Sequence, residues 1–164
     1  MPRAVSVIAA AERTQQPVAD TVILDYAQRS AGLISVTSVT GARIDIDLHA
    51  AVRLRTDDLL VLDDGRFVEV VAAPEPLLEA RAPDVAALSR LAWHLGDRHV
   101  PVQILPNRIR ARREPASEAL LTALGARVVA IDAPFDPEGG AYATPAAHGH
   151  HHGHHHAHGH DHEH

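Results

Sequence analysis

The 164-residue chain changes its pattern of apolar residues once, at Ala72-Ala73-Pro74-Glu75-Pro76, and this change limits which folds it can adopt. Two prolines in three residues interrupt strand pairing and stiffen a connection, so we expect a domain boundary there. The sequence therefore predicts an α+β protein in three parts. These are a small all-β domain at residues 1–73, a ferredoxin-like domain at 74–135, and a loop with a histidine-rich tail at 136–164.

The first part has the pattern of a β-sheet, with no competing helical period. Residues 43–48 alternate strictly between polar and apolar side chains, as a half-buried strand requires, and Asp64-Gly65 is a strong signal for a two-residue hairpin. Strands are expected at 5–9, 21–25, 33–37, 43–48, 59–62 and 67–71. We expect this domain to serve protein interaction rather than catalysis.

The second part contains two β-α-β patterns. A strand at 77–82 precedes the cap Pro83-Asp84, an apolar helical stripe and a stop at Gly96, and the next strand is expected at 100–105. A strand at 109–113 then precedes a helix that Pro115 opens and Gly125 ends, and a strand at 127–131 closes the unit. This order predicts a ferredoxin-like βαββαβ fold, with both helices on one face of a four-stranded sheet.

Eleven of the fourteen histidines lie in the last seventeen residues, which cannot bury apolar surface and are expected to be disordered. Imidazole is the commonest metal ligand and suits nickel, zinc and copper. Two other readings are a purification tag, although no histidine run exceeds three, and a solvated pH-responsive tail. The candidate ligands are His148, His150, His151, His152, His154, His155, His156, His158, His160, His162 and His164.

The composition excludes several classes of chemistry. The chain has no cysteine and no lysine, so thiol nucleophiles, Cys-based zinc sites, Schiff bases and a P-loop lysine are all excluded. It also lacks an HExxH motif and a nucleophile elbow, and we expect no enzymatic activity. A net charge of −6 with scattered arginines argues against nucleic-acid binding. With no membrane-spanning apolar run and no export signal, a cytoplasmic protein is expected.

Three histidines lie outside the tail. His94 is expected in the last turn of the first long helix, where a cation complements the helix dipole, and His49 has no evident role. His99 follows the expected helix stop and cannot form a stable metal site alone. A two-fold dimer could double it, because a residue on the symmetry axis meets its own copy.

Three segments together resemble the UreE family of urease accessory nickel metallochaperones. They are Trp93-His94-Leu95-Gly96-Asp97-Arg98-His99-Val100-Pro101-Val102-Gln103-Ile104, Pro134-Phe135-Asp136-Pro137-Glu138-Gly139-Gly140-Ala141-Tyr142, and the histidine-rich end. The resemblance implies a cytoplasmic homodimer with a nickel ligand at its interface. This ligand falls on His99, which makes the ferredoxin-like domain at 74–135 the metal-binding domain. The resemblance also implies delivery of Ni²⁺ to apo-urease together with the urease accessory GTPase.

The chain departs from this family at two places. Asp97 stands where members usually have asparagine, which could add negative charge beside the site. Some members carry a second histidine pair before the second helix, but here that stretch is Arg112-Arg113-Glu114-Pro115, without imidazole. The tail must therefore supply the remaining ligands.

A passive nickel or zinc store, or a detoxification buffer, is the alternative function. The tail alone does not separate the two, but the ordered body and the segment around His99 favour delivery. Intrinsic affinities favour copper over nickel, with zinc close behind, so Zn²⁺ and Cu²⁺ are expected competitors.

Overall fold

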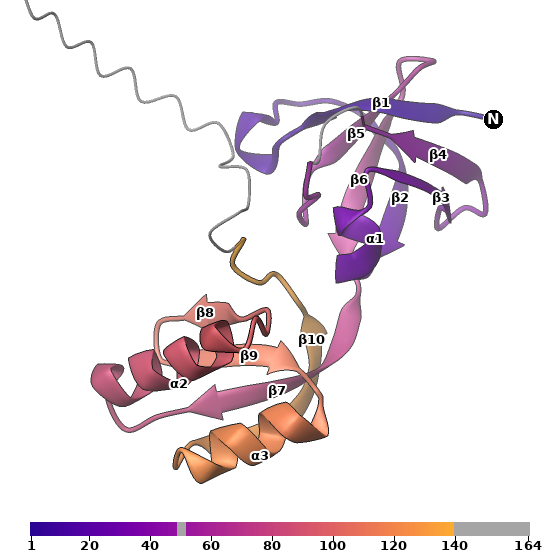
Figure 1. The fold of residues 1–164 in the computed structure, drawn as a ribbon. Helices are drawn as coiled ribbons and strands as arrows, with labels where there is room; N and C mark the ends of the chain where they lie inside the picture. The colour runs from indigo at the N-terminus through magenta and orange to yellow at the C-terminus, as the bar shows by residue number, and fades with distance from the viewer. Residues whose placement is uncertain (49–51, 140–164) are drawn as a thin grey trace, which may run out of the picture.

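The computed structural model describes residues 1–48 and 52–139 (Figure 1). His49 and the eleven tail histidines lie outside the described residues, as does the expected disorder of the tail. The described strands form two separate sheets, one of six strands and one of four. No helix in the described part of the chain is long and apolar enough to cross a membrane.

The first sheet contains all six strands that the alternation predicts, each within a few residues of its expected bounds. Its spatial order is β2-β6-β5-β1-β4-β3, with the β1–β4 and β2–β6 pairs parallel and the others antiparallel. The strands curl around one apolar core that includes Val22, Ile46 and Leu60 (Figure 1). The strands are β1 (Arg3–Ile8), β2 (Val18–Leu24), β3 (Leu33–Thr37), β4 (Arg43–Asp47), β5 (Leu59–Leu62) and β6 (Phe67–Ala72).

Two short helical turns in this domain differ from the all-strand prediction. They are the 3₁₀ turn η1 (Ala10–Glu12) and the helix α1 (Tyr26–Ser30). Asp25 and Gln28 form a capping box on α1, in which each side chain accepts the other residue's backbone N–H at 2.8 and 2.9 Å. This local pair stabilises a helix too short to show an apolar period in the sequence.

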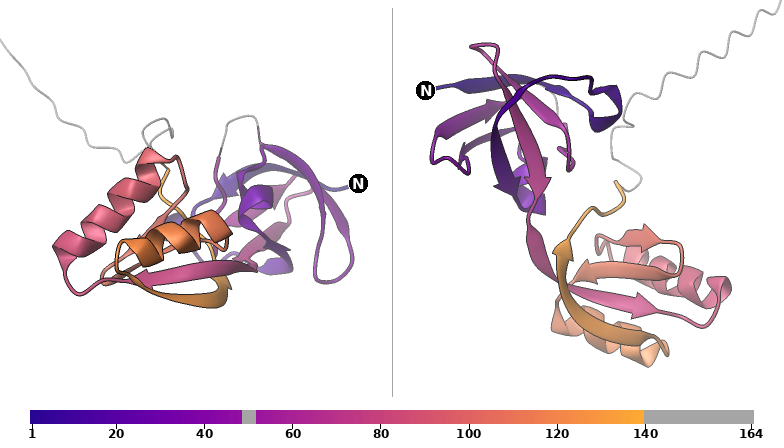
Figure 2. Two further views of the ribbon diagram at one scale, coloured as in Figure 1. Left: turned by 60° about the horizontal axis from the view of Figure 1, so that its bottom comes forward. Right: turned by 180° about the vertical axis from the view of Figure 1, so that it is seen from behind.

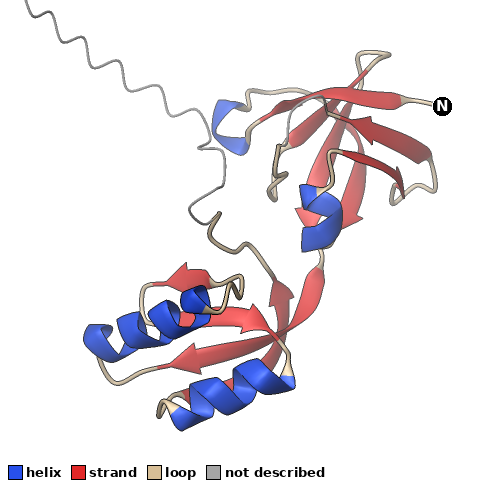
Figure 3. Cartoon of the chain, in the orientation of Figure 1, coloured by secondary structure: helices blue, strands red, loops and turns tan. Residues whose placement is uncertain are grey.

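The second sheet has the ferredoxin-like order β10-β7-β9-β8, with antiparallel pairing throughout. Both helices cover the same face of the sheet, and Leu78, Leu91, Leu95, Ile109 and Leu121 meet in one core between them (Figures 2 and 3). The predicted α+β fold class is therefore confirmed. The elements are β7 (Pro74–Arg81), α2 (Val85–Asp97), β8 (Gln103–Leu105), β9 (Arg108–Arg112), α3 (Pro115–Ala123) and β10 (Arg127–Pro134).

The prediction that the two prolines interrupt pairing is wrong, because β7 begins at Pro74 and both prolines pair with β10. The carbonyl of Pro76 accepts a hydrogen bond from the Arg113 N–H, on the side away from β10. The N–H and C=O of one strand residue point to the same side, so the missing donor of Pro76 removes nothing from the β7–β10 ladder.

Strand β8 is only three residues long, instead of the six expected at 100–105. The Val100 N–H is already used, since it donates to the Leu95 carbonyl at the end of α2, and Pro101 has no N–H to donate. Neither residue can therefore contribute a donor to the ladder.

Candidate metal centre

His99 lies immediately after α2, where the helix ends in a Schellman motif. The His99 N–H donates to Gly96 at 2.9 Å and the Val100 N–H donates to Leu95 at 3.0 Å. His99 has a φ of 57°, in the left-handed region that this motif requires. The expected stop at Gly96 is thus wrong, because Gly96 lies within α2 and the left-handed residue is the histidine.

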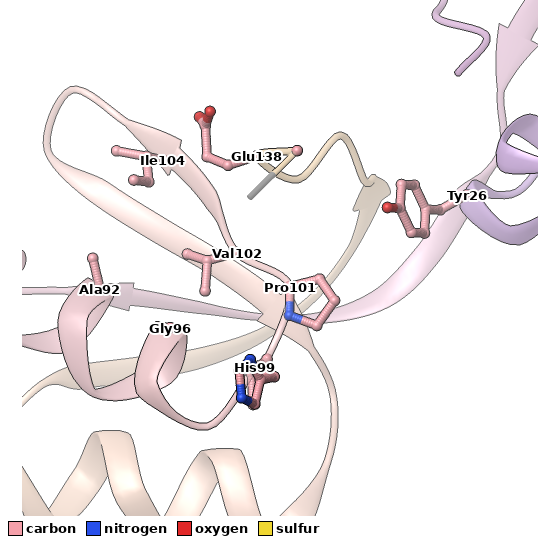
Figure 4. Close-up of a pocket in the computed structure, with 10 residues that line it drawn as sticks. Tyr26, Ala92, Gly96, His99, Pro101, Val102, Ile104 and Glu138 are labelled. Carbon is pink, nitrogen blue, oxygen red and sulfur yellow. The ribbon is translucent and has the colours of Figure 1, made fainter. Parts of the chain in front are cut away.

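The imidazole of His99 is exposed on the wall of a hollow of about 560 Å³ (Figure 4). The end of α2, the segment leading into β8, α1 and the chain after β10 all contribute to this hollow. The lining is largely apolar, which lowers the competition from water for any bound group. The lining residues are Tyr26, Ala92, Gly96, His99, Val100, Pro101, Val102, Ile104, Glu138 and Gly139.

The chain after β10 runs along this hollow toward the histidine-rich tail. The Glu138 N–H donates to the Val102 carbonyl at 2.8 Å, which extends pairing beside the segment that carries His99. Glu138 and Gly139 therefore lie in the same hollow as His99 (Figure 4). Gly139 is the last residue described before the tail, and it precedes the first tail histidine, His148, by nine residues.

The first domain holds the base of this segment through Arg29, whose side chain is fully buried. One guanidinium nitrogen of Arg29 donates to the Leu54 carbonyl at 3.2 Å and the other donates to the Phe135 carbonyl. Burial lowers the pKa of Arg29, while the nearby charges of Asp136 and Glu75 act in the opposite direction. Charged and carbonyl groups from both domains thus meet around Arg29, where the segment after β10 begins.

Aromatic packing and a second arginine strengthen this contact. The ring of Tyr26 meets the ring of Phe135 edge to face, with centroids 5.6 Å apart, and Phe135 is fully buried. Arg53 donates to the Pro137 carbonyl and lies 3.8 Å from the Asp136 carboxylate. Residues 135–137 are therefore fixed against the first domain before the chain reaches Glu138.

Among the described residues, no three His, Asp or Glu side chains come together in a group that could hold a metal ion. His94 lies in the last turn of α2, as expected, with its ring 5.1 Å from that of Trp93 and outside the lining of the hollow. Sequence reasoning missed Tyr26 and treated Glu138 only as part of a family motif. Nothing local to either residue indicates that it borders His99.

Fold and site together define a two-domain α+β protein that presents an exposed histidine, His99, in a hollow also lined by Glu138 and Gly139, and whose sequence continues into a histidine-rich tail. Models of the UreE urease accessory protein match both domains, the N-terminal model at residues 4–73 and the C-terminal model at 75–164. The chain belongs to the UreE family of urease accessory proteins.

Individual relatives agree with this assignment. The chain is 53% identical over 138 residues to a urease accessory protein UreE of Bradyrhizobium sp. strain ORS 278, covering 84% of this chain and 66% of the relative. It is 50% identical over 138 residues to one of Rhodopseudomonas palustris strain BisB18, covering 84% and 65%. A Chelativorans sp. strain BNC1 protein of the same name is 44% identical over 150 residues, with 92% of both chains covered. The chain thus spans about two thirds of the length of the first two relatives.

Proposed function

We propose that this urease accessory protein is a non-catalytic nickel metallochaperone that binds Ni²⁺ through histidines and delivers it to apo-urease. The observation that carries the proposal is the placement of an exposed His99 in a hollow that Gly139, nine residues before the first tail histidine, also lines. Family membership supports a role in urease maturation. Its proposed partners are the apo-urease complex and the urease accessory GTPase, in the cytoplasm.

The proposed nickel site is shared by two chains, with one His99 imidazole from each in a homodimer. A single imidazole is too few for a stable site, and the described residues of one chain contain no group of three or more His, Asp or Glu side chains that could hold a metal ion. A two-fold axis beside His99 doubles the donor without any further residue. The exposed apolar side chains of Trp93 (65% exposed) and Ile104 (51% exposed) support an interface on this side of the domain.

The tail histidines are proposed to complete the shared site and to hold further ions. His148 is nine residues beyond Gly139, a separation that an extended chain spans in at most about 30 Å. Tail imidazoles are therefore tethered near His99 at high effective concentration, which favours exchange of an ion between tail and site. Zn²⁺ and Cu²⁺ are expected to compete with Ni²⁺ for the same imidazoles.

Nickel transfer tests this proposal against passive storage. The nickel-loaded full-length chain, His99→Ala, a form ending at Gly139 and the combination are each mixed with apo-urease and its accessory proteins, and urea hydrolysis is followed. A chaperone accelerates activation relative to the same amount of free Ni²⁺, and His99→Ala reduces this acceleration. A storage protein slows activation in every form, in proportion to the nickel it retains.

A further inference from the structure

The second sheet has a face that no helix covers, and arginines dominate it. Leu78, Ala80, Ile109 and Ala111 pack toward the helices, so the alternate positions of β7 and β9 lie on the opposite face. That face is turned toward the viewer in the right panel of Figure 2, with α2 and α3 behind the sheet. Its arginines are Arg81 on β7, Arg108, Arg110 and Arg112 on β9, and Arg127 on β10.

The strand register places three of these arginines side by side. Arg81 is directly opposite Arg127 on one neighbouring strand and Arg108 on the other. Like charges at directly opposed positions destabilise a sheet. Such a row is unfavourable for the sheet unless neighbouring carboxylates offset its charge.

One carboxylate, Glu79, lies at the centre of this face. It meets Arg81 at 3.1 Å, Arg108 at 3.2 Å and Arg110 at 3.0 Å. Burial acts to raise the pKa of Glu79, but hydrogen bonds from Arg81 and Arg110 and the charge of Arg108 outweigh it and lower the pKa. Glu79 is thus charged at neutral pH, and one negative charge faces several positive ones.

The two remaining charged groups of the face are engaged at its end near the first domain. The guanidinium of Arg112 lies 5.5 Å from the ring centre of Tyr26, and Glu75 accepts the Tyr26 N–H at 2.8 Å. Arg81, Arg108 and Arg110 therefore surround the carboxylate of Glu79, and together with Arg127, which lies opposite Arg81, they form what we term the arginine face. Arg81, with half of its side chain exposed, and Arg127 are its accessible members.

The chemistry of this face favours carboxylates of a protein over a nucleic acid. Four-stranded sheets of this topology that bind RNA stack bases on aromatic side chains of the open face. Here the neighbouring open-face positions in the register carry Leu77, Gln103, Leu105, Val129 and Ile131, with no aromatic ring. Arginine binds carboxylates in a planar, two-point geometry, which suits the acidic side chains of a protein.

We infer that the arginine face docks an acidic surface of a partner protein. This inference rests on the proposed function, which makes the apo-urease maturation complex the partner. Docking there is separate from nickel binding, because the open face lies on the sheet and His99 lies at the end of α2. Attraction of this kind acts over about 8 Å at physiological salt and raises the association rate.

The test uses the full chain with Arg81→Gln and Arg127→Gln together, a change that removes two neighbouring charges. The matched control, Arg43→Gln with Arg90→Gln, removes two exposed arginines from β4 and α2. Binding to the purified apo-urease–accessory complex, to poly-glutamate and to poly(U) is measured at low and physiological salt. We expect the arginine-face variant to bind the complex and poly-glutamate about tenfold more weakly, with a shallower salt dependence, and the control to match the wild type.

Several outcomes overturn the inference. They are equal affinities for the two variants, tighter binding to poly(U) than to poly-glutamate, no binding by the wild type, or loss of a higher oligomer in the arginine-face variant alone. Thermal unfolding checks that both variants are folded at the temperature of the binding measurements. Nickel titration at His99 in the same preparations tests the proposed function separately, so that either proposal can fail alone.

Discussion

The two long helices of the second domain end in the same hydrogen-bonded motif but carry different residues in its left-handed position. After α3, the Gly125 N–H donates to Thr122 and the Ala126 N–H donates to Leu121, each at 3.0 Å. The bonds after α2 are the same, with His99 in place of the glycine. Gly125 has a φ of 80° and His99 a φ of 57°.

This difference separates a position selected for folding from one that carries a side chain for another reason. A side chain in the left-handed region costs roughly 1–2 kcal/mol, which glycine avoids. Gly125 has no side chain and therefore avoids this conformational cost. His99 adopts the left-handed conformation despite this cost, and its imidazole lines the hollow. Backbone strain of this kind is expected at functional sites.

The largest effect is expected from making the two helix ends alike with His99→Gly. In a form ending at Gly139, this substitution removes the only body imidazole proposed to bind nickel while leaving the helix end relaxed. Loss of a direct ligand exceeds the effect of changing a residue behind it, so the tightest nickel affinity should fall more than roughly 100-fold. Calorimetry with Ni²⁺ measures it.

The control for this experiment is His94→Ala, which removes the other described imidazole of α2. His94→Ala should leave the affinity of the tightest nickel site unchanged, because His94 packs beside Trp93 and does not line the hollow. If His94→Ala weakens nickel binding as much as His99→Gly does, the helix end is not the metal centre.

The reverse substitution, Gly125→His, should destabilise the protein by about 1–2 kcal/mol. A Cβ atom at Gly125 meets no other atom within 4 Å, so the cost arises from the backbone and not from a clash. Chemical denaturation measures the change, and Gly125→Ala should show a similar loss because it also introduces a Cβ. The new imidazole should bind no nickel tightly, since Gly125 does not line the hollow that His99 lines. A neutral result for both variants would show that the left-handed position is not strained.

The starts of the two helices also differ, which predicts a smaller effect. The Asp84 carboxylate accepts the Ala87 N–H at 2.7 Å at the start of α2, whereas Glu114 makes no such bond at the start of α3. Asp84→Ala should therefore cost about 1 kcal/mol, and Glu114→Ala should be close to neutral. Thermal unfolding of the two variants compares them directly, and equal losses would contradict the capping assignment.

Alternation and capping residues predict most of this fold, because they act over a few neighbouring residues. All six strands of the first sheet and the order of the second domain follow from them. The helix α1 does not, since it is five residues long and its Tyr26 packs against Phe135, far along the chain. The prediction that Pro74 and Pro76 interrupt strand pairing failed for a related reason. Whether a proline interrupts a ladder depends on which neighbouring strand its missing N–H would face.

The candidate site is predictable only in part. The sequence segment around His99 identifies this residue as the candidate ligand. The structure places it exposed just after α2, and its role as a ligand stays a prediction. The hollow was not predictable, because residues from both domains line it and the buried Arg29 holds the start of the segment that leads to Glu138 and Gly139. The helix end was misread because Gly96, the expected stop, fits within a helix, while histidine is an uncommon residue in the left-handed position.

The smallest expected effect is a gain of stability in His99→Gly. This variant tests most directly whether the histidine in the left-handed position after α2 destabilises the protein. Histidine adopts the left-handed region more readily than most residues, so the gain should be at most about 1 kcal/mol, less than the loss at Gly125. Glycine also raises the entropy of the unfolded chain, which offsets part of the gain. Denaturation without metal, with His99→Ala as the comparison, isolates the backbone contribution. Because alanine keeps the Cβ, His99→Gly should be more stable than His99→Ala; if the two are equal, His99 carries no strain and the contrast with Gly125 is one of residue type alone.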